Sequence, residues 1–299
     1  MTAVRWRRIA TWYLIALGGT GLVGLLWGPL GADHSALIAT TASAAAMFSP
    51  LVATAILQAR DGERPLRGIG AAPVLSRWLL VAIAVPYALV ALTLVISPLL
   101  PGVSWDWAMH GMFDRLAGSL SPEQVQAASA QVAALPVHPL LLSLPQIAVA
   151  GATLNALFAF GEEIGWRGWL QRELAPLGFW RASLLAGSLW GLWHAPLILH
   201  GHNYPDHRVV GVLLFTVVCA LLAPLLSAVR VRGGTVWAAA ILHGTFNAGA
   251  GAAMLVVQGP DLLVGLQGVP GLVAIATADL VLLAVVGRSG VVSRLSAEV

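Results

Sequence analysis

Long apolar segments constrain this 299-residue chain more than any other feature of its sequence. A helix needs about 20 mostly apolar residues to cross the hydrocarbon layer of a membrane. Eight such stretches follow one another, at 9–30, 35–58, 76–99, 142–165, 180–200, 209–228, 235–257 and 269–287. Because backbone groups inside a bilayer must be satisfied within the segment, we interpret them as helices. The sequence therefore predicts an all-α polytopic membrane protein with about eight transmembrane helices in one membrane domain, residues 1–299.

The composition agrees with this fold class and excludes several functions. Hydrophobic residues make up 58% of the chain and charged residues 10%, whereas about a quarter of the residues of a soluble protein are charged. The single cysteine, Cys219, lies in an apolar run, so one chain can form neither a disulfide nor a thiolate metal site. No basic stripe is interleaved with aromatic residues, and we expect no nucleic-acid partner.

The distribution of arginine predicts the orientation of the helices. With the N-terminus inside, 13 Arg residues are cytoplasmic, Arg115 and Arg208 lie on the other side, and Arg167 belongs to a membrane segment. Such a bias places both termini in the cytoplasm. Although three arginines precede the first apolar segment, it is longer than the core of a signal peptide, so we interpret it as a span. The cytoplasmic set is Arg5, Arg7, Arg8, Arg60, Arg64, Arg67, Arg77, Arg172, Arg181, Arg230, Arg232, Arg288 and Arg294.

Two carboxylates and a guanidinium interrupt the fourth apolar segment. A charge near the bilayer centre costs at least about 2.5 kcal/mol, so such residues pair with one another or have a function. Glu163 and Arg167 are four residues apart, and on a helix they share a face. Glu162 points elsewhere and is predicted to be the free carboxylate. The alternative is a structural ion pair with one satisfied polar residue beside it.

A histidine in the next segment is predicted to lie at the depth of Glu162. The fourth helix should continue to Gly178, where an antiparallel hairpin turns into the fifth helix. Glu162 lies 16 positions before Gly178 and His194 lies 16 positions after it, so both should be about 24 Å from the turn. Trp190 shares a face with His194, and Pro196 should open the backbone locally. The alternative role for His194 is packing.

The seventh segment adds His243 and Asn247, which are four residues apart and share a helical face. We expect them to meet the other polar residues in the cytoplasmic half of the membrane, unless they only form an interhelical hydrogen bond. Outside the membrane, the connection 101–141 contains Ser121-Pro122-Glu123-Gln124, a capping-box pattern. It predicts a short helix that ends before Pro136 and lies on the membrane surface or over the bundle.

Three motifs within residues 140–250 resemble the sequence signature of a known protein family. Glu-Glu-x-x-x-Arg, aromatic-x-x-x-His and His-x-x-x-Asn, in this order on an eight-helix chain, resemble the signature of the CAAX prenyl protease and bacteriocin-processing (CPBP) family of intramembrane proteases. Trp190 stands where the family usually has Phe. The resemblance implies an intramembrane endopeptidase similar to type II CAAX prenyl endopeptidases. We expect a multi-pass protein of a prokaryotic plasma membrane, in contact with lipid.

The resemblance also implies roles for particular residues. Glu162 would be the general base that activates water, and His194 its partner. His243 and Asn247 would hold the developing oxyanion. Glu163, Arg167 and Trp190 would support the site structurally. The implied substrate is a membrane-associated or lipidated, CAAX-like peptide, cut near its C-terminus at the cytoplasmic side.

Alternatives from other classes stay open. No cofactor is required in the favoured interpretation, but Glu162, His194 and His243 could bind Zn²⁺ with a water as fourth ligand. A second cluster, made of His200, His202, Asp206 and His207, is better explained as solvated loop residues. The chain could instead be a non-enzymatic peptide-binding or immunity protein. An ion-coupled transporter using Asp279 of the eighth segment is the last alternative, although residues 1–140 hold no counterpart of the motifs.

Overall fold

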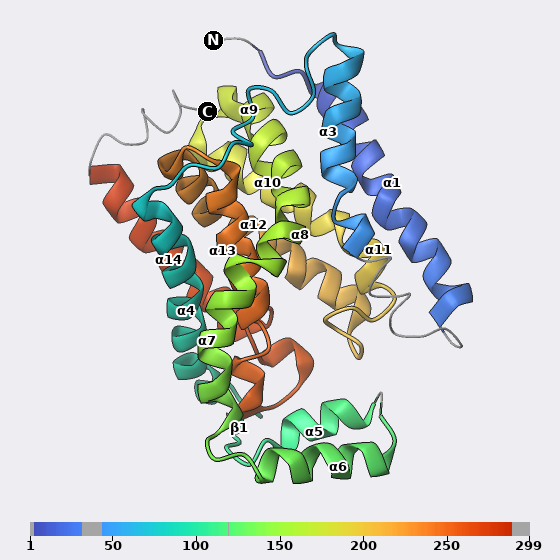
Figure 1. Ribbon diagram of the computed structural model, residues 1–299, viewed down its shortest axis with the longest axis vertical. Helices are drawn as coiled ribbons and strands as arrows, with labels where there is room; N and C mark the ends of the chain where they lie inside the picture. The colour runs from blue at the N-terminus through green and yellow to red at the C-terminus, as the bar shows by residue number, and fades with distance from the viewer. Residues whose placement is uncertain (1–2, 32–43, 119, 289–299) are drawn as a thin grey trace.

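Helices form almost all of the computed structural model, which describes residues 3–31, 44–118 and 120–288. Figure 1 shows a helical bundle with a small platform, made of α5 (His110–Ala117) and α6 (Pro122–Ala133), at one end. The bundle helices are α1 (Trp6–Gly31), α3 (Ser49–Arg60), α4 (Arg77–Ile96), α7 (Pro139–Ala152), α8 (Leu154–Glu163), α9 (Gln171–Leu174), α10 (Phe179–Trp193), α11 (Ala195–Ile198), α12 (Arg208–Gly233), α13 (Val236–Gly249) and α14 (Val269–Arg288).

Each predicted apolar segment overlaps a helix, but the lengths differ from the prediction. Among the described residues, three helices are long and apolar enough to cross a membrane alone, at Trp6–Leu25, Arg77–Leu99 and Arg208–Gly233. The bent pair α7 and α8 makes a fourth, while Ala44–Arg60 and Val269–Val285 are shorter apolar helices. Residues 35–43 of the predicted second span lie outside the described residues. A mostly helical membrane fold is supported, and the count of eight spans and the cytoplasmic termini stay predictions.

The fourth predicted span is broken rather than continuous. Thr153 departs from helical geometry between α7 and α8, and the two parts are bent by 44°. After α8 the chain forms a π-helix at Ile164–Leu170, then α9 and a 3-10 turn at Ala175–Leu177. Gly178 ends the run with a φ of +79°, a conformation that glycine adopts without steric cost. The predicted hairpin turn is confirmed, whereas the bend and the π-helix were not predicted.

A close helix crossing brings α13 against the bend between α7 and α8. A Cβ atom on Gly244 would lie 2.4 Å from the carbonyl oxygen of Gly151 and 2.6 Å from the amide nitrogen of Ala156. Small residues allow backbones in membrane bundles to approach this closely. Beside the crossing, Nδ2 of Asn155 donates to the carbonyl oxygen of Gly244 over 3.3 Å. This contact fixes the segment of α13 that carries the motif histidine beside the helix that carries the motif carboxylates.

A cluster of arginines and carboxylates ties α1 to the end of α9. Glu173 accepts hydrogen bonds from Arg5 and Arg8, with distances of 2.6 Å and 2.8 Å. Arg8 also contacts Asp61 at 2.7 Å and Glu63 at 3.1 Å. Only 7% of Arg8 and 6% of Glu173 is exposed, so each buried charge has an opposite charge beside it, as burial requires.

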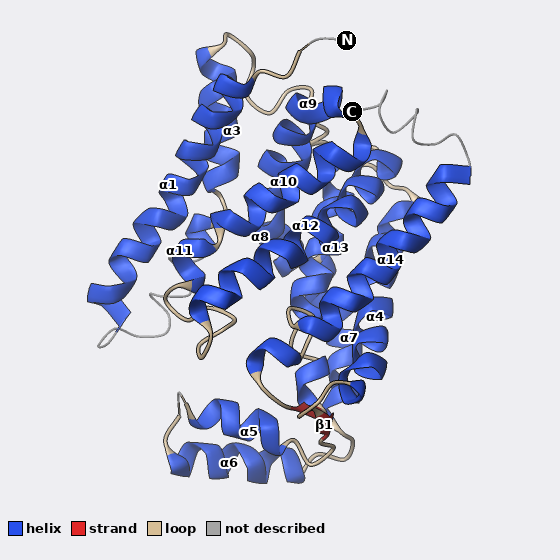
Figure 2. Ribbon diagram, turned by 180° about the vertical axis from the view of Figure 1, so that it is seen from behind, coloured by secondary structure: helices blue, strands red, loops and turns tan. Residues whose placement is uncertain are grey.

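The platform comes from the long connection between α4 and α7 (Figure 2). Its second helix, α6 (Pro122–Ala133), begins at Ser121 with the capping box formed by Ser121 and Gln124, so the predicted short helix is confirmed. Its first helix, α5 (His110–Ala117), was not predicted. Strand β1 (Ser104–Trp105) pairs antiparallel with β2 (Val257–Gln258) and joins the platform to the segment after α13.

Replacing Gly244 by alanine should destabilise the bundle. The new methyl group would meet two backbone atoms that cannot rotate away, so we expect a loss of about 3 kcal/mol and a lower thermal unfolding midpoint in detergent. Gly18→Ala in α1 is the matched control, because a Cβ there meets nothing within 4 Å. Equal midpoints for the two variants would contradict the tight crossing.

Candidate active site

The motif residues meet where α8, α10 and α13 come together. Glu162 and Glu163 form the last turn of α8, Trp190 lies in the last turn of α10, and His194 directly follows it. His243 lies in the middle of α13. The two carboxylates and His243 are each at most 3% exposed. The structure therefore buries these polar side chains inside the bundle instead of turning them toward lipid.

Glu163 is the electrostatic centre of the cluster. Its Oε1 accepts a hydrogen bond from Nη1 of Arg167 at 3.0 Å and lies 2.9 Å from Nδ1 of His243. The contact with Arg167 is the i, i+4 ion pair that the helical spacing predicts. The Arg167 guanidinium carbon also lies 4.5 Å from the ring centroid of Trp190, within cation–π distance.

Glu162 has a different environment from its neighbour. Its Oε2 accepts a hydrogen bond of 2.7 Å from Nε1 of Trp190. Among the described residues, no arginine forms an ion pair with Glu162. The two adjacent carboxylates are thus divided in the way that their spacing predicts: Glu163 holds the cation, and Glu162 keeps one oxygen available.

Trp190 contacts both imidazole rings. Its ring centroid lies 5.0 Å from that of His243 and 5.7 Å from that of His194. Its carbonyl oxygen lies 2.9 Å from Nδ1 of His194. A carbonyl only accepts, so Nδ1 carries the proton, and in the neutral ring Nε2 has a free lone pair. Within the described part of the chain no hydrogen bond joins Glu162 to His194; Trp190 links them instead.

The backbone opens at His194, as Pro196 predicts. Helix α10 ends at Trp193 and α11 begins at Ala195, so His194 stands between two helices. Its ring packs against Phe215 of α12, with centroids 4.8 Å apart. Of the side chain, 9% is exposed, which makes His194 the least covered imidazole of the cluster.

His243 and Asn247 occupy different positions along α13. Because the Glu163 carboxylate only accepts, the Nδ1 of His243 carries a proton, and Nε2 is its second functional nitrogen. Donation from Nε2 to an oxyanion requires a proton on both nitrogens. Asn247, one turn further along the same face, is exposed, and its amide has no hydrogen-bond partner among the residues described. It lies at the edge of the cluster.

The other polar candidates lie elsewhere. His200, His202, Asp206 and His207 are exposed, and Nδ1 of His207 lies 2.6 Å from Oδ1 of Asp261.

Asp279 of α14 is 8% exposed, and its Oδ1 has no partner in the described structure. Over the described ranges, no three His, Cys, Asp or Glu side chains are grouped so that they could hold a metal ion.

Two features of the site escaped the sequence analysis. The π-helix that begins directly after Glu163 is a feature often found at functional sites, but no residue pattern identifies it. The bond from Asn155 to Gly244 was also missed, although Asn155 is a polar residue in the apolar fourth segment. An amide there signals an interhelical hydrogen bond.

Replacing Glu163 by glutamine should destabilise the protein, whereas the same change at Glu162 should not. The amide at position 163 removes the charge that faces Arg167 and His243, and breaking a buried pair costs about 3 kcal/mol or more. At position 162 the amide oxygen can still accept from Trp190, so we expect a change below about 1 kcal/mol. Unfolding midpoints of the two variants in detergent test this, and equal losses would contradict the division of roles.

Comparison with known proteins identifies a family model for part of the chain. No curated protein matches the chain. Residues 142–249, which include all three motifs, match the family model described as type II CAAX prenyl endopeptidase Rce1-like. The match supports the assignment to the CPBP family, and over these residues the chain is similar to type II CAAX prenyl endopeptidases.

Proposed function

We propose that the chain is an intramembrane endopeptidase that hydrolyses a peptide bond of a membrane-associated or lipidated, CAAX-like substrate. The family match supports an intramembrane protease of the CAAX type in general. The observation that carries the finer proposal is the position of Trp190, which is hydrogen-bonded to Glu162 and in ring contact with both His194 and His243. One buried cluster thus contains an acid and two imidazoles.

The proposed reaction begins with a water molecule between Glu162 and His194. The free oxygen of Glu162 accepts a proton from the water, and Nε2 of His194 accepts its other hydrogen as a hydrogen bond. The water oxygen then forms a bond to the carbonyl carbon of the substrate. A side chain that acts as general base in this way contributes typically 10²- to 10⁴-fold to the rate.

The second part of the reaction concerns the carbonyl oxygen, which becomes negative as the tetrahedral intermediate forms. His243 and Asn247 lie on one face of α13 and donate to this oxygen, His243 from Nε2 in its doubly protonated form. The intermediate then collapses, the C–N bond breaks, and the leaving amine takes the proton from Glu162. Donors fixed in a water-poor site stabilise such an oxyanion by several kcal/mol.

The support around the site is electrostatic. Glu163 holds Arg167 and His243 in fixed positions, and Trp190 orients the Glu162 carboxylate. A site whose reacting groups are already in position when the substrate binds has a higher reaction rate. The apolar helices support an integral membrane protein, and we propose the plasma membrane of a prokaryote as its location.

Replacing Glu162 by glutamine should abolish cleavage without preventing folding. The amide cannot accept the proton from water, and we expect a loss of about 10³-fold or more in kcat. Cleavage of a farnesylated peptide that ends in Cys-Val-Ile-Ala, followed by chromatography of the products, measures the effect. Full activity of Glu162→Gln would end the protease proposal, and a cellular function that survives this change and His194→Ala would favour the non-enzymatic scaffold.

A metal chelator separates side-chain catalysis from the zinc alternative. In the proposed mechanism water is activated by side chains, so incubation with 1,10-phenanthroline should leave the cleavage rate unchanged. Loss of activity that Zn²⁺ restores would assign Glu162, His194 and His243 to a metal instead.

Replacing Trp190 by phenylalanine should slow cleavage and leave the fold intact. The ring that packs against both imidazoles is kept, but the indole N–H that orients Glu162 is lost. A hydrogen bond to a charged group is worth about 1.5 kcal/mol, so we expect kcat to fall roughly tenfold. Trp237→Phe is the matched control, because it removes an indole hydrogen bond to the carbonyl oxygen of Ala71 and none to a motif residue. Equal rates for both variants would contradict an orienting role for Trp190.

A further inference from the structure

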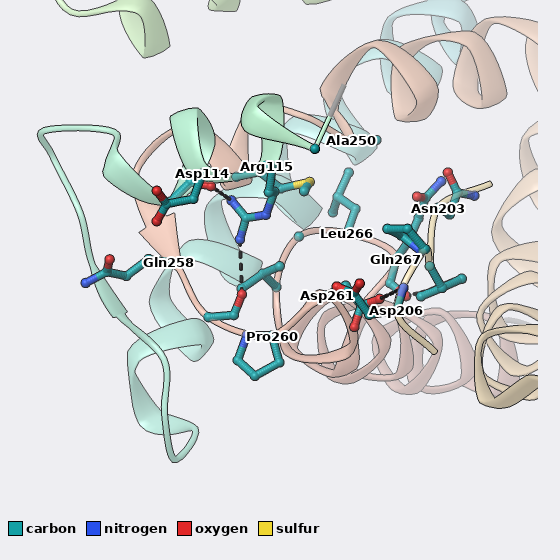
Figure 3. A pocket seen from close by; sticks show the side chains of 18 of the residues that line it. Asp114, Arg115, Asn203, Asp206, Ala250, Gln258, Pro260, Asp261, Leu266 and Gln267 are labelled. Carbon is teal, nitrogen blue, oxygen red and sulfur yellow. Dashed lines mark hydrogen bonds between the residues drawn. The ribbon is translucent and has the colours of Figure 1, made fainter. Parts of the chain in front are cut away.

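Two cavities outside the candidate active site differ in the charge of their lining. The larger, of about 950 Å³, lies between the platform and the bundle, and two arginines line it together with Asp114, Asp206 and Asp261 (Figure 3). Because charges of both signs are mixed there, its lining selects neither an anion nor a cation. The smaller, of about 470 Å³, has a described lining without any carboxylate. This arginine pocket is lined by Arg5, Trp6, Arg7, Arg8, Thr11 and Arg60.

The arginine pocket lies where two helices meet the surface of the membrane. The candidate span of α1 begins at Trp6, and the apolar helix Ala44–Arg60 ends at the pocket. The two helices lie side by side and run in opposite directions (Figure 1). Trp6 is 54% exposed, and tryptophan is enriched where lipid headgroups meet the hydrocarbon. The pocket therefore lies at the depth of the headgroups and not of the acyl chains.

Positive charge is in excess around the arginine pocket. Arg7 is exposed, and among the described residues no carboxylate forms an ion pair with it. Three carboxylates that do not line the pocket are shared among four other arginines. The ion pairs join Glu173 to Arg5 and Arg8, Asp61 to Arg8 and Arg60, and Glu63 to Arg8 and Arg172. Arg7 can therefore bind an anion without breaking an ion pair.

The donors of the arginine pocket suit a phosphate group. A guanidinium presents a planar fork of N–H donors that matches two oxygens of a phosphate. Arg5, Arg7 and Arg60 are exposed side chains of the lining, so a phosphate between them can accept from more than one guanidinium. The hydroxyl of Thr11 donates to the carbonyl oxygen of Arg7 at 3.0 Å and can still accept a hydrogen bond. The hydroxyl of a glycerol headgroup is a donor of this kind.

Exposed apolar side chains continue from the pocket along both helices. On α1, Leu14 follows Arg7 two turns later on the same face and is exposed. On α3, Ile56 and Val52 precede Arg60 at spacings of four residues and are exposed as well. The acyl chains of a lipid cover such side chains, whereas free phosphate has no group that does. The pocket and the two apolar faces together match a phospholipid.

We propose that the arginine pocket binds the phosphate of an anionic phospholipid such as phosphatidylglycerol. Arg7 pairs with the phosphate, and Arg5 and Arg60 donate to its remaining oxygens. The acyl chains lie along the exposed faces of α1 and α3. The predicted orientation makes this the cytoplasmic leaflet, where anionic lipids attract basic residues next to a span.

A lipid in this position joins two helices that support the candidate active site. The ring centroid of Trp12 in α1 lies 5.0 Å from that of Trp166 in the π-helix. A Cβ atom on Gly165 would lie 2.4 Å from Cβ of Pro50 in α3. Both contacts are in the segment that directly follows Glu163. We therefore expect a bound lipid to raise the thermal unfolding midpoint, because a ligand of the folded state stabilises it.

A comparison of two lipids tests the charge of the ligand. Dioleoyl phosphatidylglycerol and dioleoyl phosphatidylcholine have the same acyl chains, and native mass spectrometry of the protein in detergent measures the apparent Kd of each. We expect phosphatidylglycerol to bind the native protein roughly tenfold more tightly, and Arg7→Gln to remove this difference, because one charge-assisted hydrogen bond is lost. Arg64→Gln is the matched control: Arg64 is exposed at the same end but lies outside the lining, so this variant should bind like the native protein. Equal affinities for the two lipids, or equal losses in the two variants, would overturn the proposal.

Thermal unfolding in detergent distinguishes the lipid from free phosphate and needs no cleavage. Without lipid, Arg7→Gln should unfold at the midpoint of the native protein, because no ion pair is removed. Phosphatidylglycerol should raise the midpoint of the native protein by several degrees and that of Arg7→Gln by much less, whereas inorganic phosphate at the same concentration should change neither. A shift with inorganic phosphate as large as that with phosphatidylglycerol would assign the pocket to a soluble anion. That result, or an equal shift with phosphatidylcholine, would refute the lipid site.

Discussion

The shared carboxylate of Glu163 is the interaction on which the rest of the site depends. A guanidinium and an imidazole from different helices meet at a single oxygen of this residue, in a place where uncompensated charge is costly. Because Glu163 compensates Arg167, Glu162 can remain without a cation only one residue away. The pair thus explains why one carboxylate of two has an ion pair and the other has only the hydrogen bond from Trp190.

The polar residues of the motifs lie at irregular positions of the helices. The carboxylates end α8 just before a π-helix, and His194 stands in the break between α10 and α11. Both departures from regular α-helix occur where the polar residues are. In a membrane, irregular backbone is tolerated where it is buried in protein or lines a water-filled cavity. The fold thereby concentrates polar backbone and polar side chains at one level of the bundle.

Local rules predicted the parts of the structure that depend on neighbouring residues. The Ser121 capping box, the turn at Gly178 and the contact between Glu163 and Arg167 each involve residues at most four positions apart or a single glycine. The bend at Thr153, the pairing of β1 with β2 and the bond from Arg8 to Glu173 were missed. The last joins residues 165 positions apart, and spacing along the sequence holds no information about such contacts.

Arginines at the two ends of the bundle have different hydrogen-bond partners. At one end, the buried Arg8 is surrounded by three carboxylates, so its charge is compensated within the fold. At the other, Arg115 is tied to backbone carbonyls and faces a cavity. A carbonyl fixes the position of a guanidinium but leaves its charge uncancelled. Arg115 is therefore held in place by neutral carbonyls, and the carboxylates of Asp106, Asp114 and Asp261 act on its charge without forming a close ion pair.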